Sequence, residues 1–168
     1  MNTHETIQQF AKMLRNLEGW LDKATAHATA KSFDVDVLVQ ARLAPDQYAF
    51  VRQVQASCDS AKFAAAYLSG RKAPVHPDTE KSFAELRERI RACLSFLDSI
   101  PRDEYGPATE RKVSPPWLGG KWIRGDEYLA QAAIPNFYFH ITTAYAILRH
   151  NGVDVGKMDY IGSVPTHD

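Results

Sequence analysis

Hydrophobic residues recur at intervals of three and four along four separate segments of the chain. In residues 4 to 30 they are Ile7, Phe10, Leu14, Leu17, Leu21, Ala24 and Ala28. This spacing places the side chains on one face of an α-helix, so the segment is predicted to be a helix that buries that face.

The second segment runs from Pro45 to Ser69, with apolar positions at Val51, Val54, Cys58, Ala61, Ala65 and Leu68. Pro45 is expected at the first helical position, where an N–H group is not needed, and Gly70 is expected to end the helix. The stretch before it, residues 34 to 47, is predicted to be a short helix or a turn.

The third segment is predicted to begin with Asp78 as its N-cap and to end before Pro101, which cannot continue a helix. Its apolar positions are Phe83, Leu86, Ile90, Leu94 and Leu97. Residues 71 to 78, RKAPVHPD, form a linker.

The fourth segment is predicted to start with Asp126 as its cap and to end at Asn151 and Gly152. Its apolar positions are Ile134, Phe137, Ile141, Ala144, Tyr145 and Leu148. Pro135 lies inside this segment and lacks an N–H group, so a kink or a break is expected there.

The remaining segments are rich in turn residues. The stretch KVSPPWLGGKWIRG, residues 112 to 125, is predicted to form a small hairpin with Gly119 and Gly120 at the turn. Residues 153 to 168 are expected to be a strap or a partly disordered end. The pattern therefore predicts one all-α domain over residues 1–168, a four-helix bundle with a hairpin between helices three and four.

Composition narrows the function without identifying it. The chain has 168 residues, of which 45% are hydrophobic, and its 20 basic and 20 acidic residues cancel. A near-neutral protein has little attraction for phosphate backbones, so nucleic acid is not expected as a partner. With neither a signal peptide nor an apolar run long enough to cross a membrane, we expect a cytoplasmic protein without membrane contact. Cys58 and Cys93 lie in apolar helical surroundings and are interpreted as core residues.

Two pairs of polar residues form the candidate site. Asn136 and His140 are four residues apart on the fourth helix, and Gln55 and Asp59 have the same spacing on the second. This spacing places both members of a pair on one side of a helix, where they can share a ligand or a metal ion. The simpler interpretation is a hydrogen-bonded pair on one helix and exposed ion pairs of Asp59 with Lys62 or Arg52 on the other.

The outer face of the fourth helix also carries apolar residues, Phe139 and Ile147. A helix that is apolar almost all round is usually covered on both sides. We therefore expect the hairpin, the tail or a second subunit to pack there, and we predict a homodimer.

Two long segments resemble a known family. ARLAPDQYAFVRQVQASCDSAKFAAAYLSG and IPNFYFHITTAYAILRHNGVDVGKMDYIG are similar to a bacterial family of unassigned function in the DinB/YfiT-like superfamily. The resemblance implies a DinB-like bundle, often dimeric, in a superfamily that includes metal-dependent transferases with three histidine ligands. It places His140 at the later of the two positions on the last helix and Asn136 at the earlier one. Gln55 or Asp59 stands where the second helix would carry a histidine.

Three interpretations remain open. The first is a metal-dependent enzyme in which His140 and Asp59, with Asn136 or Gln55, bind zinc or nickel. The second is a metal-free module that binds an unknown small molecule or forms a dimer through a buried polar network. The third is acid–base catalysis by His140 and Asp59, for which no nucleophile is visible. The sequence contains no HExxH, paired CxxC, GxSxG, Walker or dinucleotide-binding motif, so no catalytic residue is assigned and no organic cofactor is expected.

Overall fold

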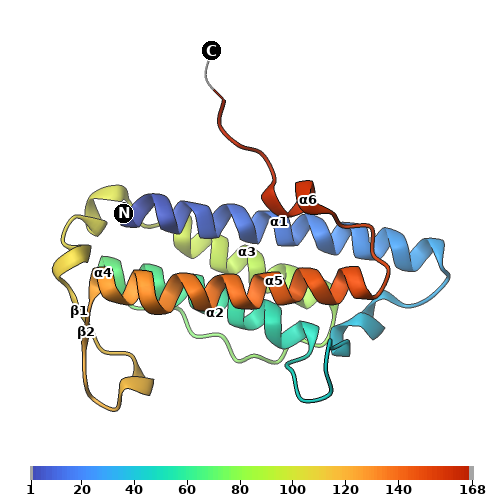
Figure 1. Cartoon of the computed structure of the whole chain (residues 1–168), viewed down its shortest axis with the longest axis horizontal. Helices are drawn as coiled ribbons and strands as arrows, with labels where there is room; N and C mark the ends of the chain where they lie inside the picture. Colours follow the sequence, from blue (N-terminus) through green and yellow to red (C-terminus); the bar gives the residue numbers. More distant parts are fainter. Residues whose placement is uncertain (1, 167–168) are drawn as a thin grey trace.

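Four long helices run side by side along the long axis of the molecule (Figure 1). The computed structural model describes residues 2–166. The first three helices are α1 (Thr3–Ala30), α2 (Phe50–Ser69) and α3 (Phe83–Asp98). The fourth is continuous through α4 (Gly125–Tyr128), the π-helical turn η5 (Leu129–Ala133) and α5 (Ile134–His150). The prediction of an all-α four-helix bundle is confirmed.

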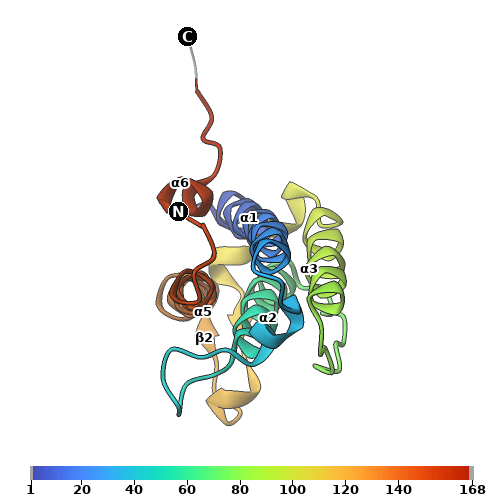
Figure 2. The ribbon, with the colours of Figure 1, turned by 90° about the vertical axis from the view of Figure 1, so that its right-hand side faces the viewer.

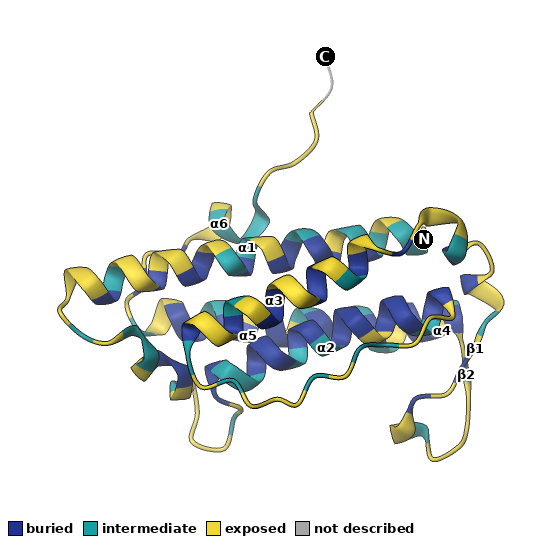
Figure 3. Ribbon diagram, turned by 180° about the vertical axis from the view of Figure 1, so that it is seen from behind, coloured by how far each residue is buried: buried dark blue, intermediate teal, exposed yellow. Residues whose placement is uncertain are grey.

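The predicted apolar stripes form the core. Figure 2 looks along the bundle and shows α2 between α5 and α3, with α1 above it. The inward faces are buried along all four helices (Figure 3), and Phe10 of α1 stacks on Phe137 of α5 with ring centroids 4.2 Å apart. Val51, Ile134 and Tyr145 are partly buried at the margin of this core. Cys58 and Cys93 are fully buried free thiols, as predicted.

Helix α2 begins at Phe50, so the predicted start at Pro45 is wrong. A short helix, η1 (Val35–Gln40), precedes it as expected. After η1 the chain makes a turn in which Arg42 Nη1 donates to the carbonyl of Gln47 at 3.2 Å. The Phe50 N–H then donates to the carbonyl of Ala41 at 2.9 Å. These local contacts pair backbone groups around Pro45 without a helix.

Helix α3 begins after Ser82, so the predicted cap at Asp78 is also wrong. The Ser82 hydroxyl accepts from the Glu85 N–H at 3.2 Å, and the Glu85 carboxylate accepts from the Ser82 N–H at 3.2 Å. This reciprocal pair is a capping box. Asp78 instead lies in the linker with a positive φ of 54°. From there its carboxylate binds Arg52 of α2 and Arg89 of α3.

The fourth helix starts at Gly125, one residue before the predicted cap, Asp126. The Arg124 N–H, which precedes the helix, donates to the Glu127 carboxylate at 3.3 Å. The break expected at Pro135 takes the form of η5, in which the Ile134 N–H donates to the carbonyl of Leu129. A π turn re-pairs the backbone so that the helix continues without the N–H that proline lacks.

The hairpin prediction is confirmed. Strands β1 (Lys112–Val113) and β2 (Ile123–Arg124) pair antiparallel, with Lys112 opposite Arg124 and Val113 opposite Ile123. Gly119 and Gly120 in the connection both have positive φ, of 58° and 86°. The connection also contains the short 3-10 helix η4 (Pro116–Leu118), and two more, η2 (Arg102–Tyr105) and η3 (Ala108–Glu110), precede the hairpin.

The C-terminal segment is a strap across α1, and its last helix is α6 (Lys157–Ile161). Val153 and Val155 are buried, and Trp20 Nε1 donates to the carbonyl of Asp159 at 3.0 Å. The predicted disordered end would include residues 167 and 168, which lie outside the described residues. Within residues 2–166, no helix is both long enough and apolar enough to span a bilayer.

Candidate functional site

A pocket lies between α2, α5 and the hairpin. It consists of two adjoining hollows that share Ser60, Trp117, Tyr128 and Asn136, and we call it the α2–α5 pocket. The hollow beside His140 has a volume of about 490 Å³, which lies within the range of about 300–1,000 Å³ typical of small-molecule sites. Its walls are largely aromatic, formed by Tyr48, Phe63, Tyr67, Trp117, Tyr128 and, in the second hollow, Phe139.

His140 is oriented by Gln53 of α2. The His140 Nδ1 lies 2.8 Å from Gln53 Oε1, and Gln53 Nε2 donates to the carbonyl of Tyr48 at 3.2 Å. Because that carbonyl can only accept, the amide nitrogen must face it and the amide oxygen must face the imidazole. His140 therefore carries its proton on Nδ1, and Nε2 keeps a free lone pair.

The environment of His140 favours the neutral ring. Burial and, to a smaller extent, the nearby Arg52 guanidinium lower the pKa of His140 below its usual value. A neutral imidazole with Nδ1 protonated presents an acceptor, not a donor, at Nε2. His140 is 9% exposed and lines the α2–α5 pocket.

Asn136 presents a second acceptor. The Ser60 hydroxyl donates to the carbonyl of Ala56 at 2.7 Å, so its oxygen accepts from Asn136 Nδ2, which lies 2.6 Å away. The amide nitrogen of Asn136 is thereby held toward α2. Its Oδ1 is left as an acceptor for a ligand, beside the second N–H of the amide.

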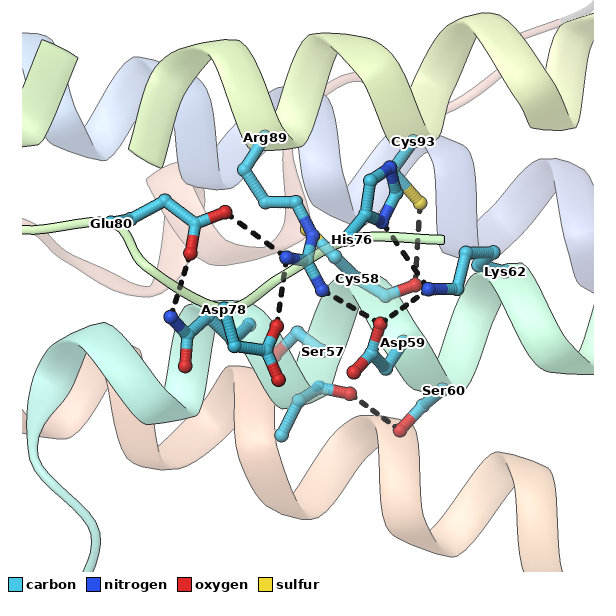
Figure 4. Close-up of polar contacts among 12 residues, drawn as sticks. Ser57, Cys58, Asp59, Ser60, Lys62, His76, Asp78, Glu80, Arg89 and Cys93 are labelled. Carbon is cyan, nitrogen blue, oxygen red and sulfur yellow. Dashed lines mark hydrogen bonds and ion pairs between the residues drawn. The ribbon is translucent and has the colours of Figure 1, made fainter. Parts of the chain in front are cut away.

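Asp59 is held by cations from two directions (Figure 4). Its Oδ1 accepts from Arg89 Nη2 and from Lys62 Nζ, both at 2.7 Å. The simpler interpretation expected an exposed pair of Asp59 and Lys62, but the Lys62 side chain is only 3% exposed. Asp59 makes no hydrogen bond to His140 among the described residues, although both line the α2–α5 pocket.

Gln55 does not join the other three predicted residues. Its Nε2 donates to Glu80 Oε2 at 2.7 Å, and its Oε1 accepts from Arg52 Nη1 at 3.3 Å. It therefore binds the linker before α3. The structure brings Asp59, Asn136 and His140 to one pocket and leaves Gln55 outside its lining.

Arg89 of α3 organises the polar groups behind Asp59. Its guanidinium binds Asp59, Asp78 at 2.9 Å and Glu80 at 3.0 Å (Figure 4). Burial lowers the pKa of Arg89, but these carboxylates more than offset that effect and raise it overall. Asp78 is affected in the opposite sense: burial raises its pKa, and the hydrogen bonds from Arg52 and Arg89 bring it below the usual value.

His76 and the two cysteines, Cys58 and Cys93, lie beside this network. Lys62 Nζ is 3.2 Å from His76 Nδ1, and burial, followed by the charges of Arg89 and Lys62, lowers the pKa of His76. Cys93 Sγ donates to the carbonyl of Cys58 at 3.3 Å. A hydrogen bond with Cys93 and burial raise the pKa of the Cys58 thiol, which disfavours the reactive thiolate at Cys58.

Sequence reasoning missed Gln53 and Arg89, although each left a signal. Arg89 follows Leu86 by three residues and precedes Cys93 by four, which places it on the buried face of its helix. Gln53 precedes Ser57 by four and Ser60 by seven, so these polar residues form a stripe along α2. A charged or amide side chain on a buried face needs a partner, and that requirement was the available clue.

The chain has the four-helix-bundle fold of a DinB family member. In a crystal structure, a DinB family member protein from Shewanella denitrificans is 48% identical to this chain, with a TM-score of 0.92. The match covers 96% of this chain and 92% of that one. Residues 3–161 match a family described as a domain of unknown function, DUF1993, and the chain belongs to that family. No curated protein matches the chain.

The donor atoms of the pocket do not fit the zinc or nickel site that the superfamily implies. Such a site needs three or four imidazole, thiolate or carboxylate ligands. Within residues 2–166, no three histidine, cysteine, aspartate or glutamate side chains are grouped to hold a metal ion. His140 is the single imidazole in the pocket, and two cations already bind the Asp59 carboxylate.

Proposed function

We propose that this protein binds a small organic molecule in the α2–α5 pocket without a metal ion. The observation that carries this proposal is the combination of an aromatic wall with convergent polar atoms of fixed orientation, His140 Nε2 and Asn136 Oδ1. Binding sites for small molecules typically join apolar walls to a few oriented polar groups. Because Gln53 and Ser60 already hold these side chains, a ligand would find them preorganised.

A pocket-filling variant tests this proposal. Indole is a suitable neutral probe because it is flat and aromatic, and saturation-transfer NMR detects weak binding. We expect the wild-type protein to bind indole and Ala56→Trp, which fills the pocket from α2, to lose that binding. Ala92→Trp, at an exposed position on α3, is the matched control and should bind as the wild type does.

A second filling variant guards against misfolding of the first. Asn136→Phe narrows the same pocket from α5, and circular dichroism reports whether each variant folds. Indole binding that persists in either folded variant would mean that the molecule binds elsewhere, and the proposal would be wrong.

The alternative is a metal-dependent enzyme that uses His140, Asp59 and Asn136. Two observations support this alternative: His140 Nε2 has a free lone pair, and all three residues line one pocket. Elemental analysis of protein prepared without chelator separates the two proposals. We expect substoichiometric zinc and nickel; a stoichiometric metal that His140→Ala removes would favour the enzyme.

A further inference from the structure

Three side chains that line the α2–α5 pocket, His140, Asn136 and Asp59, each keep a hydrogen-bond acceptor free of partners. The His140 Nδ1–H donates to Gln53 Oε1, and one N–H of the Asn136 amide donates to Ser60 Oγ. That leaves the His140 Nε2 lone pair and the Asn136 Oδ1 for a ligand. Asp59 adds Oδ2, because both of its cations bind Oδ1.

The π-helical turn changes the backbone pairing in the same wall. The Ile134 N–H, which an α-helix would direct to the carbonyl of Ala130, donates to Leu129 instead. Pro135 has no N–H to offer the carbonyl of Gln131. Gln131 lines the α2–α5 pocket, so a carbonyl that has lost its α-helical donor lies in the pocket wall.

Each cation near the pocket forms an ion pair with a carboxylate. Arg52 reaches the pocket wall, but its Nη1 binds Asp78 at 2.5 Å and also Gln55. Lys62 and Arg89 bind Asp59. Together with Glu80, the network contains three cations and three carboxylates, so the net charge behind the pocket is zero. The net charge of the network therefore favours neither a cationic nor an anionic ligand. Ligand preference depends instead on the local hydrogen-bonding groups and on the faces of the aromatic rings.

The aromatic walls favour the same class of ligand. The faces of tyrosine, tryptophan and phenylalanine rings attract cations and N–H groups through their quadrupoles. Tyr48 lies nearly parallel to the His140 ring, at 14° with centroids 6.4 Å apart, and Tyr67 meets Tyr128 edge to face. Flat walls of this kind suit a flat ligand.

We infer that the natural ligand is a planar aromatic or heteroaromatic molecule whose edge carries N–H donors, of the amidine, amine or amide class. This inference rests on the proposed function and names the chemistry that the pocket selects. The ring lies between the aromatic side chains, and its N–H groups donate to His140 Nε2, Asn136 Oδ1 and Asp59 Oδ2. A carboxylate at the same edge of the ring would be repelled by these three acceptors.

Three molecules of one shape test the inference. Benzamidine, benzamide and benzoate share one planar shape, but the edge group carries donors at both positions, at one, or at neither, and it is cationic, neutral and anionic in that order. We expect benzamidine to bind at least about ten-fold more tightly than benzoate, with benzamide between them, in NMR titrations of the full chain. Asn136→Ala should weaken benzamidine by about five-fold and leave benzoate unchanged. Ser95→Ala, exposed on α3, is the control for both.

The outcomes separate this inference from the proposed function. If benzoate binds as tightly as benzamidine, and Ala56→Trp abolishes both, the pocket binds small molecules but the donor class is wrong. If Asn136→Ala weakens both molecules equally, the amide oxygen does not discriminate, and the inference is again wrong. If none of the three molecules binds and indole also fails, both proposals fail.

Discussion

At the scale of single residues, Arg89 is the side chain on which the most partners depend. Its side chain is 1% exposed, and it contacts the linker through Asp78 and Glu80 and contacts α2 through Asp59. Its Nε has no hydrogen-bond partner among the described residues. The ion pairs must therefore also offset the free-energy cost of burying this unpaired N–H group. The same ion pairs fix Asp59 Oδ1, so Arg89 also positions a group of the α2–α5 pocket.

Removing this one cation should destabilise the protein strongly. Arg89→Met leaves three carboxylates without their shared partner, and loss of one member of a buried ion pair costs about 3–5 kcal/mol. These carboxylates are 12–30% exposed, so water solvates them in part and reduces the cost of leaving them unpaired. We therefore expect the free energy of unfolding, measured in urea, to fall by about 3 kcal/mol. Arg91→Met is the matched control: Arg91 is 56% exposed, and solvent screens its ion pairs, so we expect little change in stability. Equal losses in the two variants would contradict the role of Arg89.

At the scale of elements, the π turn explains how the fourth helix contributes two residues to the pocket. Tyr128 and Asn136 are eight residues apart, which in an α-helix would rotate them by about 80° relative to each other. A π turn accommodates one extra residue and reduces that difference to about 20°. Both residues line the pocket, in accord with this alignment. The turn near Pro135 thus places the start of the helix and its middle on one face.

The start of the same helix depends on a glycine. A Cβ atom at Gly125 would lie 1.9 Å from the carbonyl oxygen of Ala108 and 3.1 Å from Leu68 Cδ2. Gly125→Ala should therefore destabilise the protein by about 2–3 kcal/mol through overpacking. Gly19→Ala is the contrasting variant, because Gly19 lies within α1 and has open space around its Cβ position. It should stabilise the protein by about 0.5–1 kcal/mol, and thermal unfolding measures both. A stabilising Gly125→Ala would show that α4 does not pack on Ala108.

At the scale of the whole molecule, an apolar surface remains that the hairpin and the strap do not cover. Phe139 is 57% exposed, Trp117 65% and Phe63 37%. Trp117 lines one hollow with Phe139 and the other with Phe63, so the three side chains border one pocket. Ile147, also assigned to the outer side of the helix, is fully buried within the single chain.

We expect this surface to mediate self-association. A cluster of exposed aromatic side chains is typical of interaction surfaces, and a homodimer is the most frequent assembly. Sedimentation velocity at micromolar concentration should show a dimer, and Phe139→Glu should shift it to a monomer. Val75→Glu, which replaces a residue that is 86% exposed in the linker, should leave the dimer intact. A wild-type protein that stays monomeric at high concentration would contradict this expectation.

Much of the fold was predictable because helix formation and amphipathicity are local. The stripes of Leu14 and Leu17 on α1 and of Leu86 and Ile90 on α3 repeat within a few residues, and burial followed from that spacing. The hairpin was also predictable, since Gly119 and Gly120 supply the positive φ angles that its turn requires. The helix starts were less predictable: Pro45 and Asp78 have suitable chemistry, but a local turn holds Pro45 outside α2, and ion pairs with Arg52 and Arg89 hold Asp78 outside α3.

The sequence by itself determined which residues are chemically able to form a site, and Asn136, His140 and Asp59 do reach one pocket. It could not determine their partners. Gln53 and Gln55 are two residues apart and carry the same amide, yet only Gln53 orients His140, while Gln55 binds Glu80. That choice depends on the rotation of α2 relative to α5 and on the path of the linker, both set by packing among residues far apart in the chain. Hydrogen-bond direction followed from these contacts, and with it the acceptor character of the pocket, because a side chain offers a ligand only the atoms that its neighbours leave free.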